Sequence, residues 1–528
     1  MGEVNERLGA GAAVVGRVAA GSAARDAHAP SVGELLDETP TGAFHRRAVV
    51  VSGVGFFTDA YDLFVISIVA TIVTAQWHLG RGETSWVNGS AILAAFVGAL
   101  VFGRLADLLG RKRVYAIVAM LMIVGAISSA CAPGFWWLVG SRAILGLGIG
   151  GDYPVSAVLM SEYSNRHDRG RLVGLVFSMQ ALGLVVGPLV AVALLASGVG
   201  HGLAWRILLA AGALPAAAVV YLRTRMPESP RFTAQVRGDA ARAAADLVAF
   251  SAGAIAVPAA AAATHRSLRP RRLLLDRHLL AIVVGTAGSW FVFDYAYYGN
   301  TLSLPAILAE VDPRATLLAK LVWTLGMFLV FAAPGYAFAV KRMDRIGHRR
   351  LQLVGFAILA AAFAALGAFH GLTTAVGPFL AVFGLTYFFV EFGPNTTTFV
   401  LPSELFPTEL RATGHGIASG LGKLGAFVGV FLVPQLETHI GLRGMLLVAG
   451  GAAGAGMLLT LLLPEPAGLG LDEVYPGPPL DSAARRRGRA PGGRDVEHLG
   501  TGGRSNVHAD SVGAPDAVGA STEIGALQ

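Results

Sequence analysis

The sequence predicts an all-α integral membrane protein with twelve transmembrane helices in two pseudo-symmetric six-helix bundles. Three observations support this fold class. First, 54% of the 528 residues are hydrophobic and only 14% are charged, whereas a soluble domain carries about 25% charged residues. Second, apolar segments of about 20 residues, long enough to cross a bilayer, recur along the chain. Third, short motifs in the first half of the chain return in the second half.

The expected spans divide into two groups around a basic connector. They lie near 47–74, 86–109, 112–131, 134–162, 169–197 and 205–223, and near 277–301, 316–340, 348–369, 373–402, 409–436 and 441–464. We therefore expect, in chain order, a disordered tail (1–43), an N-terminal bundle (44–223), a connector (224–276), a C-terminal bundle (277–464) and a second disordered tail (465–528). Neither tail has the apolar periodicity that a packed core requires.

Lys and Arg residues are divided unevenly between the short loops. Thirteen lie in loops on the side of the termini and the connector, and five lie in the opposite loops. Because basic loops remain in the cytoplasm, we expect both termini and the connector to be cytoplasmic, with the protein in the cytoplasmic membrane. The same bias accounts for the net charge of +7, so a nucleic acid partner is not expected. The single cysteine, Cys131, excludes an intrachain disulfide, and we expect it to be a buried structural residue.

Short motifs repeat between the two halves at nearly constant spacing. The pairs are Asp107-x-x-Gly110-Arg111 with Asp344-x-x-Gly347-His348, Ser161-Glu162 with Ser403-Glu404, and Phe56-x-x-Asp59 with Phe291-x-x-Asp294. Internal duplication with a site between the halves is the architecture of secondary transporters. The repeat therefore directs attention to polar residues within the spans.

Asp294 places a carboxylate in the middle of an apolar segment. An acid at this depth is costly and marks a functional site by default. Trp290, Asp294 and Tyr298 are spaced four residues apart and share one helix face. An interfacial aromatic belt is the alternative for the two aromatic residues alone, but the carboxylate between them favours a polar ligand site.

Other spans also contain polar residues. Asp59 and Asp62 lie on one face of the first span, where a water-exposed helix end is the alternative. Asp152 and Tyr153 follow two glycines in the fourth span, whose alternative role is close helix packing. We expect Asp152 to pair with Arg142, or to lie beside a carboxylate of the first span.

Three further residues complete the candidate site. Gln180 lies in the fifth span, Asn395 follows Gly-Pro in the tenth, and Lys423 lies too deep in the eleventh to reach the interface. Lys423 should therefore pair with a carboxylate or an anionic ligand. A third group lies at span ends, where charges that hold helices together or gate the transporter are expected: Asp107, Arg111, Glu162, Arg169, Asp344, Glu404 and Arg411.

Several motifs resemble those of the major facilitator superfamily. They are Gly103-Arg-Leu-Ala-Asp-Leu-Leu-Gly-Arg-Lys112, Arg142-x-x-x-Gly-x-Gly-x-x-Gly151 and Pro227-Glu-Ser-Pro-Arg-Phe232. The second of these resembles a signature of proton-coupled members. Others resemble the phosphate:H⁺ symporter family over about residues 44–465: Phe56-Phe-Thr-Asp-Ala-Tyr-Asp-Leu-Phe64, Gly151-Asp-Tyr-Pro-Val-Ser-Ala157, Trp290…Asp294…Tyr298 and Gly393-Pro-Asn-Thr-Thr-Thr-Phe-Val-Leu-Pro-Ser-Glu404.

The resemblance implies roles for these residues. The phosphate ligands would be Tyr153, Gln180, Trp290, Asp294, Tyr298 and Asn395, with Lys423 near them. Proton coupling would involve Asp59, Asp62, Asp152 and Arg142. The residue types agree with this substrate, because dihydrogen phosphate has P–OH donors for the Asp294 carboxylate. Fully ionised sulfate has no such donor and would be repelled.

We therefore expect proton-coupled import of inorganic phosphate by alternating access, carried out by a functional monomer in the lipid bilayer. A symporter for an organic anion or a sugar is the alternative, and a phosphate sensor is a further one. No activated nucleophile and no histidine spacing typical of a metal site is present in the sequence. We expect neither enzymatic activity nor a cofactor.

Overall fold

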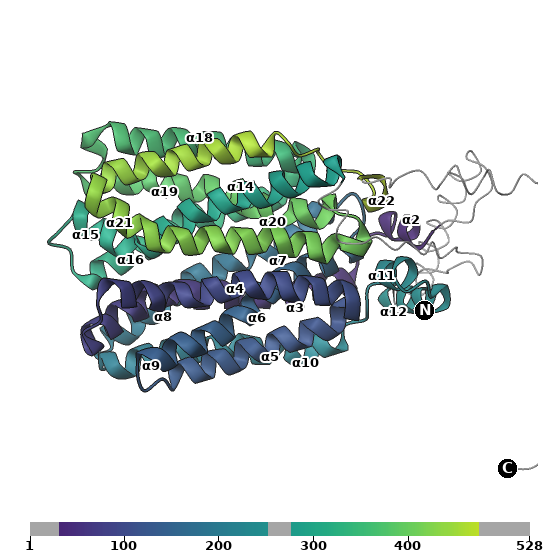
Figure 1. Cartoon of the computed structure of the whole chain (residues 1–528), viewed down its shortest axis with the longest axis horizontal. Helices are drawn as coiled ribbons and strands as arrows, with labels where there is room; N and C mark the ends of the chain where they lie inside the picture. The colour runs from purple at the N-terminus through teal and green to yellow at the C-terminus, as the bar shows by residue number, and fades with distance from the viewer. Residues whose placement is uncertain (1–30, 252–275, 475–528) are drawn as a thin grey trace, which may run out of the picture. The chain divides into compact units, whose positions relative to one another are not determined.

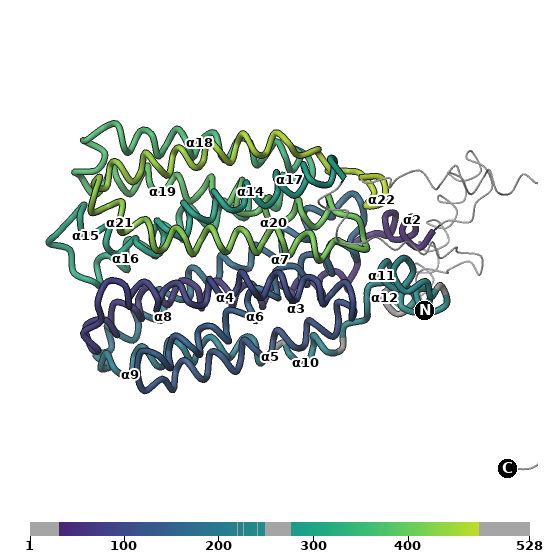
Figure 2. The backbone as a smooth tube through the Cα atoms, in the orientation of Figure 1, coloured from purple at the N-terminus to yellow at the C-terminus, as the bar shows by residue number. Residues whose placement is uncertain are grey.

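The structure is a computed structural model that describes residues 31–251 and 276–474. The described residues form helices and turns, without a β-strand. The long helices of the first half are α3 (Ala43–Trp77), α4 (Arg81–Leu109), α5 (Arg111–Ala130), α6 (Phe135–Tyr163), α7 (Arg169–Ser178), α8 (Gln180–Ala196), α9 (His201–Ala211) and α10 (Ala213–Arg225). Figure 2 shows them gathered in one group below the helices of the second half.

The second half contains α14 (Arg277–Leu302), α15 (Leu304–Val311), α16 (Leu317–Met327), the π-helical turn η1 (Phe328–Ala332), α17 (Ala333–Ile346), α18 (His348–Ala368), η2 (His370–Leu372), α19 (Val376–Phe392), α20 (Pro394–Leu405), η3 (Thr408–Leu410) and α21 (Arg411–Thr460). Several expected spans consist of two consecutive elements. The breaks fall at Met179, Gly212 and Gly393, where one helix ends and the next begins.

The described residues contain eleven helical segments long and apolar enough to cross a membrane. The last segment contains two of the twelve expected spans, because α21 continues for 50 residues. A helix of this length would extend about 75 Å, far more than the roughly 30 Å hydrocarbon core. Gly441, at φ +70°, interrupts the helical geometry where the eleventh expected span gives way to the twelfth. The predicted all-α membrane fold is confirmed.

Glycines set the closest helix contacts within each half. In α6, a Cβ at Gly146 or Gly150 would collide with backbone carbonyls of α4. In α21, a Cβ at Gly425 or Gly429 would collide with carbonyls of α14. Small residues allow helices to approach closely in membranes. The corresponding contact in the second half brings α14 and α21, with Asp294 and Lys423, face to face.

Four short helices lie together at one end of the bundles (Figure 1): α2 (Val32–Asp37), α11 (Pro230–Gln235), α12 (Ala240–Ser251) and α22 (Leu471–Val474). We call this the connector end. Helix α2 begins with a capping box, in which Ser31 Oγ accepts from Glu34 N at 3.2 Å and Glu34 Oε2 accepts from Ser31 N at 2.8 Å. Its side chains Leu35 and Leu36 are buried.

The structure corrects three expectations. Residues 31–43 were assigned to a disordered tail but include the buried helix α2, and residues 465–474 include α22. The rest of both tails, 1–30 and 475–528, lies outside the described residues, as does 252–275 of the connector. Cys131 is exposed rather than buried, because it caps the end of α5 where the chain turns toward α6.

Candidate functional site

Lys423 lies at the centre of the candidate site. Its Nζ atom is 3.2 Å from Asp294 Oδ2 and donates a hydrogen bond to Tyr298 OH at 2.9 Å. The same nitrogen lies 4.5 Å from the ring centroid of Tyr153 and 4.4 Å from that of Tyr298, within the range of cation–π attraction. All four side chains are buried. The expected pairing of Lys423 with a carboxylate is therefore present.

Asp294 has one engaged and one unengaged oxygen. Oδ2 contacts Lys423, whereas Oδ1 makes no hydrogen bond with the described residues. Trp290 lies one turn before Asp294, and its ring contacts those of Tyr153 at 6.1 Å and His415 at 5.7 Å. Its indole packs on Gly422, where a Cβ would leave no room for it. The glycine of α21 thus allows the indole to lie beside the ion pair.

A chain of hydrogen bonds links this centre across the two halves. Gln180 Nε2 donates to Tyr153 OH at 3.0 Å, and Tyr336 OH donates to Gln180 Oε1 at 3.2 Å. Asn395 Nδ2 then donates to Tyr336 OH at 2.8 Å. Helix breaks before Gln180 and Asn395 place both amides at the starts of helices, α8 and close to the start of α20. The structure therefore brings together all seven residues that the sequence analysis assigned to substrate.

Aromatic rings enclose this cluster. Phe177 and Phe399, from opposite halves, stack with centroids 4.4 Å apart. Phe56 contacts Phe399 at 4.9 Å, and Phe64 stacks on Tyr298 at 5.5 Å. Apolar walls lower the local dielectric, which strengthens the interactions of the enclosed charges.

Asp59 and Asp62 lie in α3 and are fully buried, each with 0% exposure. All four of their carboxylate oxygens lack a hydrogen-bond partner among the described residues. Arg142 NH2 donates to the backbone carbonyl of Asp62 at 2.9 Å. Arg142 thus lies beside Asp62, and both remain candidates for proton coupling.

The expected pairing of Asp152 with Arg142 was wrong, whereas the alternative neighbour, a carboxylate of the first span, is present in Asp59, which interacts electrostatically with Asp152. Asp152 forms a bidentate ion pair with Arg223 of α10, at 2.8 Å from Oδ1 and 3.1 Å from Oδ2. The Arg223 guanidinium also lies 4.0 Å from the centroid of the Tyr115 ring. Arg142 precedes Asp152 by ten residues, or about 15 Å along the helix, which is too far for a direct pair. The sequence placed Arg223 at a span end, where a basic residue is ordinary, so no sequence signal distinguished it.

The charged residues at span ends form a network at the connector end. Glu162 Oε1 accepts from Arg111 at 2.9 Å and from Arg411 of the other half at 3.3 Å. Asp107 is 3.2 Å from Arg111 and accepts from Thr413 N at 2.7 Å. These contacts join α4, α5 and α6 to the start of α21.

The second copy of the motif forms a related group. The His348 imidazole lies 2.9 Å from Glu404 and 3.2 Å from Asp344. Asp344 also accepts from the backbone N of Arg171 at 2.8 Å, which joins α17 to α7. Each half thus uses its motif acid to hold the backbone of the other half.

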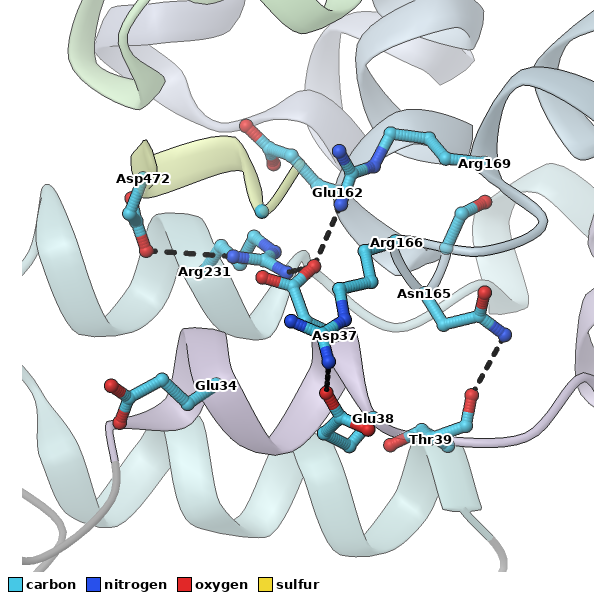
Figure 3. Close-up of polar contacts among 12 residues, drawn as sticks. Glu34, Asp37, Glu38, Thr39, Glu162, Asn165, Arg166, Arg169, Arg231 and Asp472 are labelled. Carbon is cyan, nitrogen blue, oxygen red and sulfur yellow. Dashed lines mark hydrogen bonds and ion pairs between the residues drawn. The ribbon is translucent and has the colours of Figure 1, made fainter. Parts of the chain in front are cut away.

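Arg169 has a different partner from its counterpart Arg411. Its NH2 atom is 2.7 Å from Asp37 Oδ1 of α2, and Arg231 of α11 is 2.7 Å from the same oxygen (Figure 3). Arg169 also donates to the carbonyl of Leu469 at 2.9 Å, and Arg231 is 3.6 Å from Asp472. The carboxylate of Asp37 therefore holds two buried guanidinium groups, both of which contact the segment that follows the second half.

Comparison with known proteins identifies the family. Residues 48–476 match the sugar (and other) transporter family. The chain belongs to this family. The inorganic phosphate transporter 1-6 of Oryza sativa subsp. japonica is 38% identical over 83% of this chain and 94% of its own length. The probable inorganic phosphate transporter 1-6 of Arabidopsis thaliana is 35% identical over 84% of this chain and 96% of its own length.

Solved structures show the same fold. The major facilitator proton:xylose symporter XylE bound to 6-bromo-6-deoxy-D-glucose matches with a TM-score of 0.71 and 20% identity, covering 82% of this chain and 98% of that chain. A partially occluded inward-open structure of XylE from E. coli gives 0.65, covering 80% and 99%. The predicted membership in the major facilitator superfamily, among relatives named as phosphate transporters, is confirmed. The chain is a multi-pass membrane transporter and not an enzyme.

In this transporter, the end opposite the connector end contains a cavity of about 530 Å³. It lies between the halves, with walls that include Thr71 and Asn88 from the first half and Ser303 and Gln435 from the second. The rim residue Arg81 is exposed. Because the connector end is joined by ion pairs, this conformation is closed there and hollow at the other end.

One buried carboxylate of the transporter was not among the expected site residues, although it meets the criterion applied to Asp294, an acid within an apolar span. Glu391 of α19 is fully buried within a span, with 0% exposure. Its Oε1 accepts from Tyr297 OH at 3.0 Å, and its Oε2 accepts from Asn395 Nδ2 at 2.6 Å. It therefore extends the hydrogen-bond chain beyond Asn395.

Proposed function

We propose that this transporter imports inorganic phosphate together with protons. The N-terminal bundle (44–223) and C-terminal bundle (277–464) would alternate in opening, with the substrate between them near the membrane midplane and residues 224–276 connecting them. The basic loops favour an orientation with both termini in the cytoplasm and the protein in the cytoplasmic membrane. Relatives of 38% and 35% identity carry the name of phosphate transporters, and the protein would act as a monomer.

The geometry of Asp294 is the observation that supports this substrate best. Lys423 supplies a buried positive charge 3.2 Å from one carboxylate oxygen, while Oδ1 accepts no hydrogen bond from the described residues. Dihydrogen phosphate combines a negative charge for Lys423 with P–OH donors for Oδ1. Trp290, Tyr298 and the Tyr153–Gln180–Asn395 group would supply the remaining contacts. An anion without a donor would meet the Asp294 charge without a compensating hydrogen bond.

Asp59, Asp62 and Asp152 would carry the protons. Arg142 would influence the protonation of Asp62. Ionised carboxylates without partners are costly at membrane depth. Binding a proton on one face of the membrane relieves that cost, and the carrier then reorients. Asp152 keeps Arg223 as its counter-ion at 2.8 Å, so its protonation would release that arginine.

The residues favour phosphate over the other substrates that the family allows. A neutral sugar carries no charge that could pair with Lys423 or Asp294. These two buried charges would then contribute no ionic interaction to its binding. An organic anion would need a second cation, but Arg142 is bound to the backbone of Asp62 at 2.9 Å and is not part of the Lys423 cluster.

Uptake into proteoliposomes tests the proposal. Labelled phosphate should accumulate when the outside is more acidic than the lumen, and unlabelled sulfate or xylose in excess should not compete. Absence of phosphate uptake would refute the substrate assignment. Uptake that ignores the pH gradient would refute proton coupling while leaving the substrate in place.

A further inference from the structure

The Glu391 carboxylate is buried without a cation. Its two oxygens accept hydrogen bonds from Tyr297 at 3.0 Å and Asn395 at 2.6 Å. Among the described residues, no Lys, Arg or His lies within ion-pair distance of it. This contrasts with Asp152 and Asp294, which have Arg223 and Lys423 as counter-ions. A buried carboxylate that lacks a cation is held in its charged form only by its hydrogen bonds.

Phenols are the titratable groups that surround Glu391. Tyr297 and Tyr298 come from α14, Tyr336 from α17 and Tyr387 from α19 itself. Helices α16, α18 and α20 and the short helices η1 and η2 also pack against α19, and none of them, His370 of η2 included, places a cation in contact with the carboxylate. Phenols stay neutral near pH 7. The proton balance of this region therefore depends on Glu391.

Glu391 competes with the substrate for a donor. The Asn395 amide nitrogen has two hydrogens, and both are used, one by Tyr336 at 2.8 Å and one by Glu391 at 2.6 Å. While Glu391 is ionised, it accepts the Asn395 amide hydrogen that a phosphate oxygen would need. Its negative charge also lies next to Asn395, where it would repel the phosphate. Protonation would remove the charge and free the amide.

Three cavities, adjacent ones sharing a lining residue, lie between the end opposite the connector end and the surroundings of Glu391. The cavity of about 530 Å³ shares Ser67 with a smaller one, which in turn shares Thr301 with a third. The third, of about 20 Å³, is lined by Tyr297, Asn300 and Tyr387 and has room for about one water. The buried side-chain amide of Asn300 makes no hydrogen bond with the described residues. Tyr297 bridges this last cavity and the carboxylate.

We propose that Glu391 is a second proton-binding group, in the C-terminal bundle, whose protonation permits phosphate to bind Asn395. The inference rests on the proposed phosphate function and adds a route separate from the acids of the N-terminal bundle. A proton from the hollow end passes by the third cavity and the Tyr297 hydroxyl to the carboxylate, giving the neutral acid. Asn395 then donates to phosphate, and the proton leaves from Glu391 after the bundles reorient. Proton and phosphate binding are thereby linked with positive cooperativity.

Calorimetry of phosphate binding to the purified transporter tests the linkage. The dissociation constant is measured from pH 5.5 to 8.5 and is calculated from the concentration of dihydrogen phosphate. Glu391→Gln imitates the neutral acid. It should bind like the wild type at low pH and at least about fivefold more tightly at high pH, the lower end of typical coupling. Glu391→Asp keeps a titratable group and should retain the wild-type pH dependence. Thr386→Val is the matched control, because this α19 residue lines the same cavity and bonds only its own helix at Phe383.

A wild-type pH profile in Glu391→Gln, or an equal loss of affinity at all pH values, would overturn the inference. If this variant does not fold, Tyr297→Phe decides the question. Removing a donor from the carboxylate should move the pH profile of binding to higher pH, and an unchanged profile would overturn the proposal. Failure of the wild type to bind phosphate at any pH would instead refute the underlying function.

Discussion

Asp37 provides the sharpest test of how α2 is held at the connector end. One oxygen of this carboxylate lies 2.7 Å from both Arg169 and Arg231, whose side chains are 2% and 0% exposed. Asp37→Asn keeps the size of the side chain and removes its charge. Both guanidinium groups then lose their common counter-ion while remaining buried.

The expected cost follows from this burial. Removing one partner of a buried ion pair costs about 3–5 kcal/mol, and the Asp37 side chain is 12% exposed, so we take the lower value. About 3 kcal/mol corresponds to an increase of roughly 140-fold in the population of undocked α2. Glu38→Gln is the matched control in the same segment. Glu38 pairs with Arg166 at 2.5 Å, but these side chains are 31% and 36% exposed, and such surface pairs contribute about 0–1 kcal/mol.

Cysteine labelling measures this undocking directly. Val32 in α2 is 3% exposed, so Val32→Cys in a Cys131→Ser background reports the open state through its maleimide labelling rate. Labelling should accelerate about 140-fold with Asp37→Asn and at most about fivefold with Glu38→Gln. An Asp37→Asn rate within about threefold of the background would refute the reasoning. Equal acceleration by both variants would assign the effect to net charge rather than to the buried ion pairs.

Three other predictions concern transport and stability. Asp294→Asn should express normally and lose phosphate transport, because an amide cannot accept from P–OH through two oxygens; near-normal transport would remove Asp294 from the site. Asp59→Asn or Asp62→Asn should abolish proton-driven accumulation while at least one of them retains phosphate exchange, since exchange needs no net proton transfer; intact accumulation in both would exclude them as essential carriers. Arg223→Met should lower stability by about 3–5 kcal/mol, seen as a lower thermal midpoint in detergent, and adding Asp152→Leu should recover most of it; a single variant that melts like the wild type would contradict this.

The central ion pair was predictable in part. Asp294 and Lys423 both lie deep within apolar spans, where an unpaired charge is energetically costly. Each is therefore expected to have a partner. The same rule applies to Glu391, which was overlooked among the surrounding phenylalanines. This rule could not identify Arg223, because basic residues are common at span ends. Only the structure shows that its side chain pairs with Asp152.

The tails illustrate a second limit. Composition predicts that residues 1–43 and 465–528 cannot build a core alone. Two short pieces of them are nevertheless ordered, because α2 and α22 pack against α11 and the ends of the bundles. The capping box at Ser31 and Glu34 was a readable local signal for α2, but the ion pair that secures Asp37 depends on residues more than a hundred positions away.

The sequence by itself determined the membrane class, the two related halves and the family, because hydropathy, loop charge and motif spacing are local properties of the chain. It also marked most of the substrate cluster, since polar residues at bilayer depth are rare enough to be conspicuous. The tertiary structure alone decided which polar groups meet: Asp152 with Arg223, Asp37 with Arg169 and Arg231, and Glu391 with Asn395. Such pairings depend on the rotation and approach of neighbouring helices, which glycine contacts and helix breaks set and which no local pattern specifies.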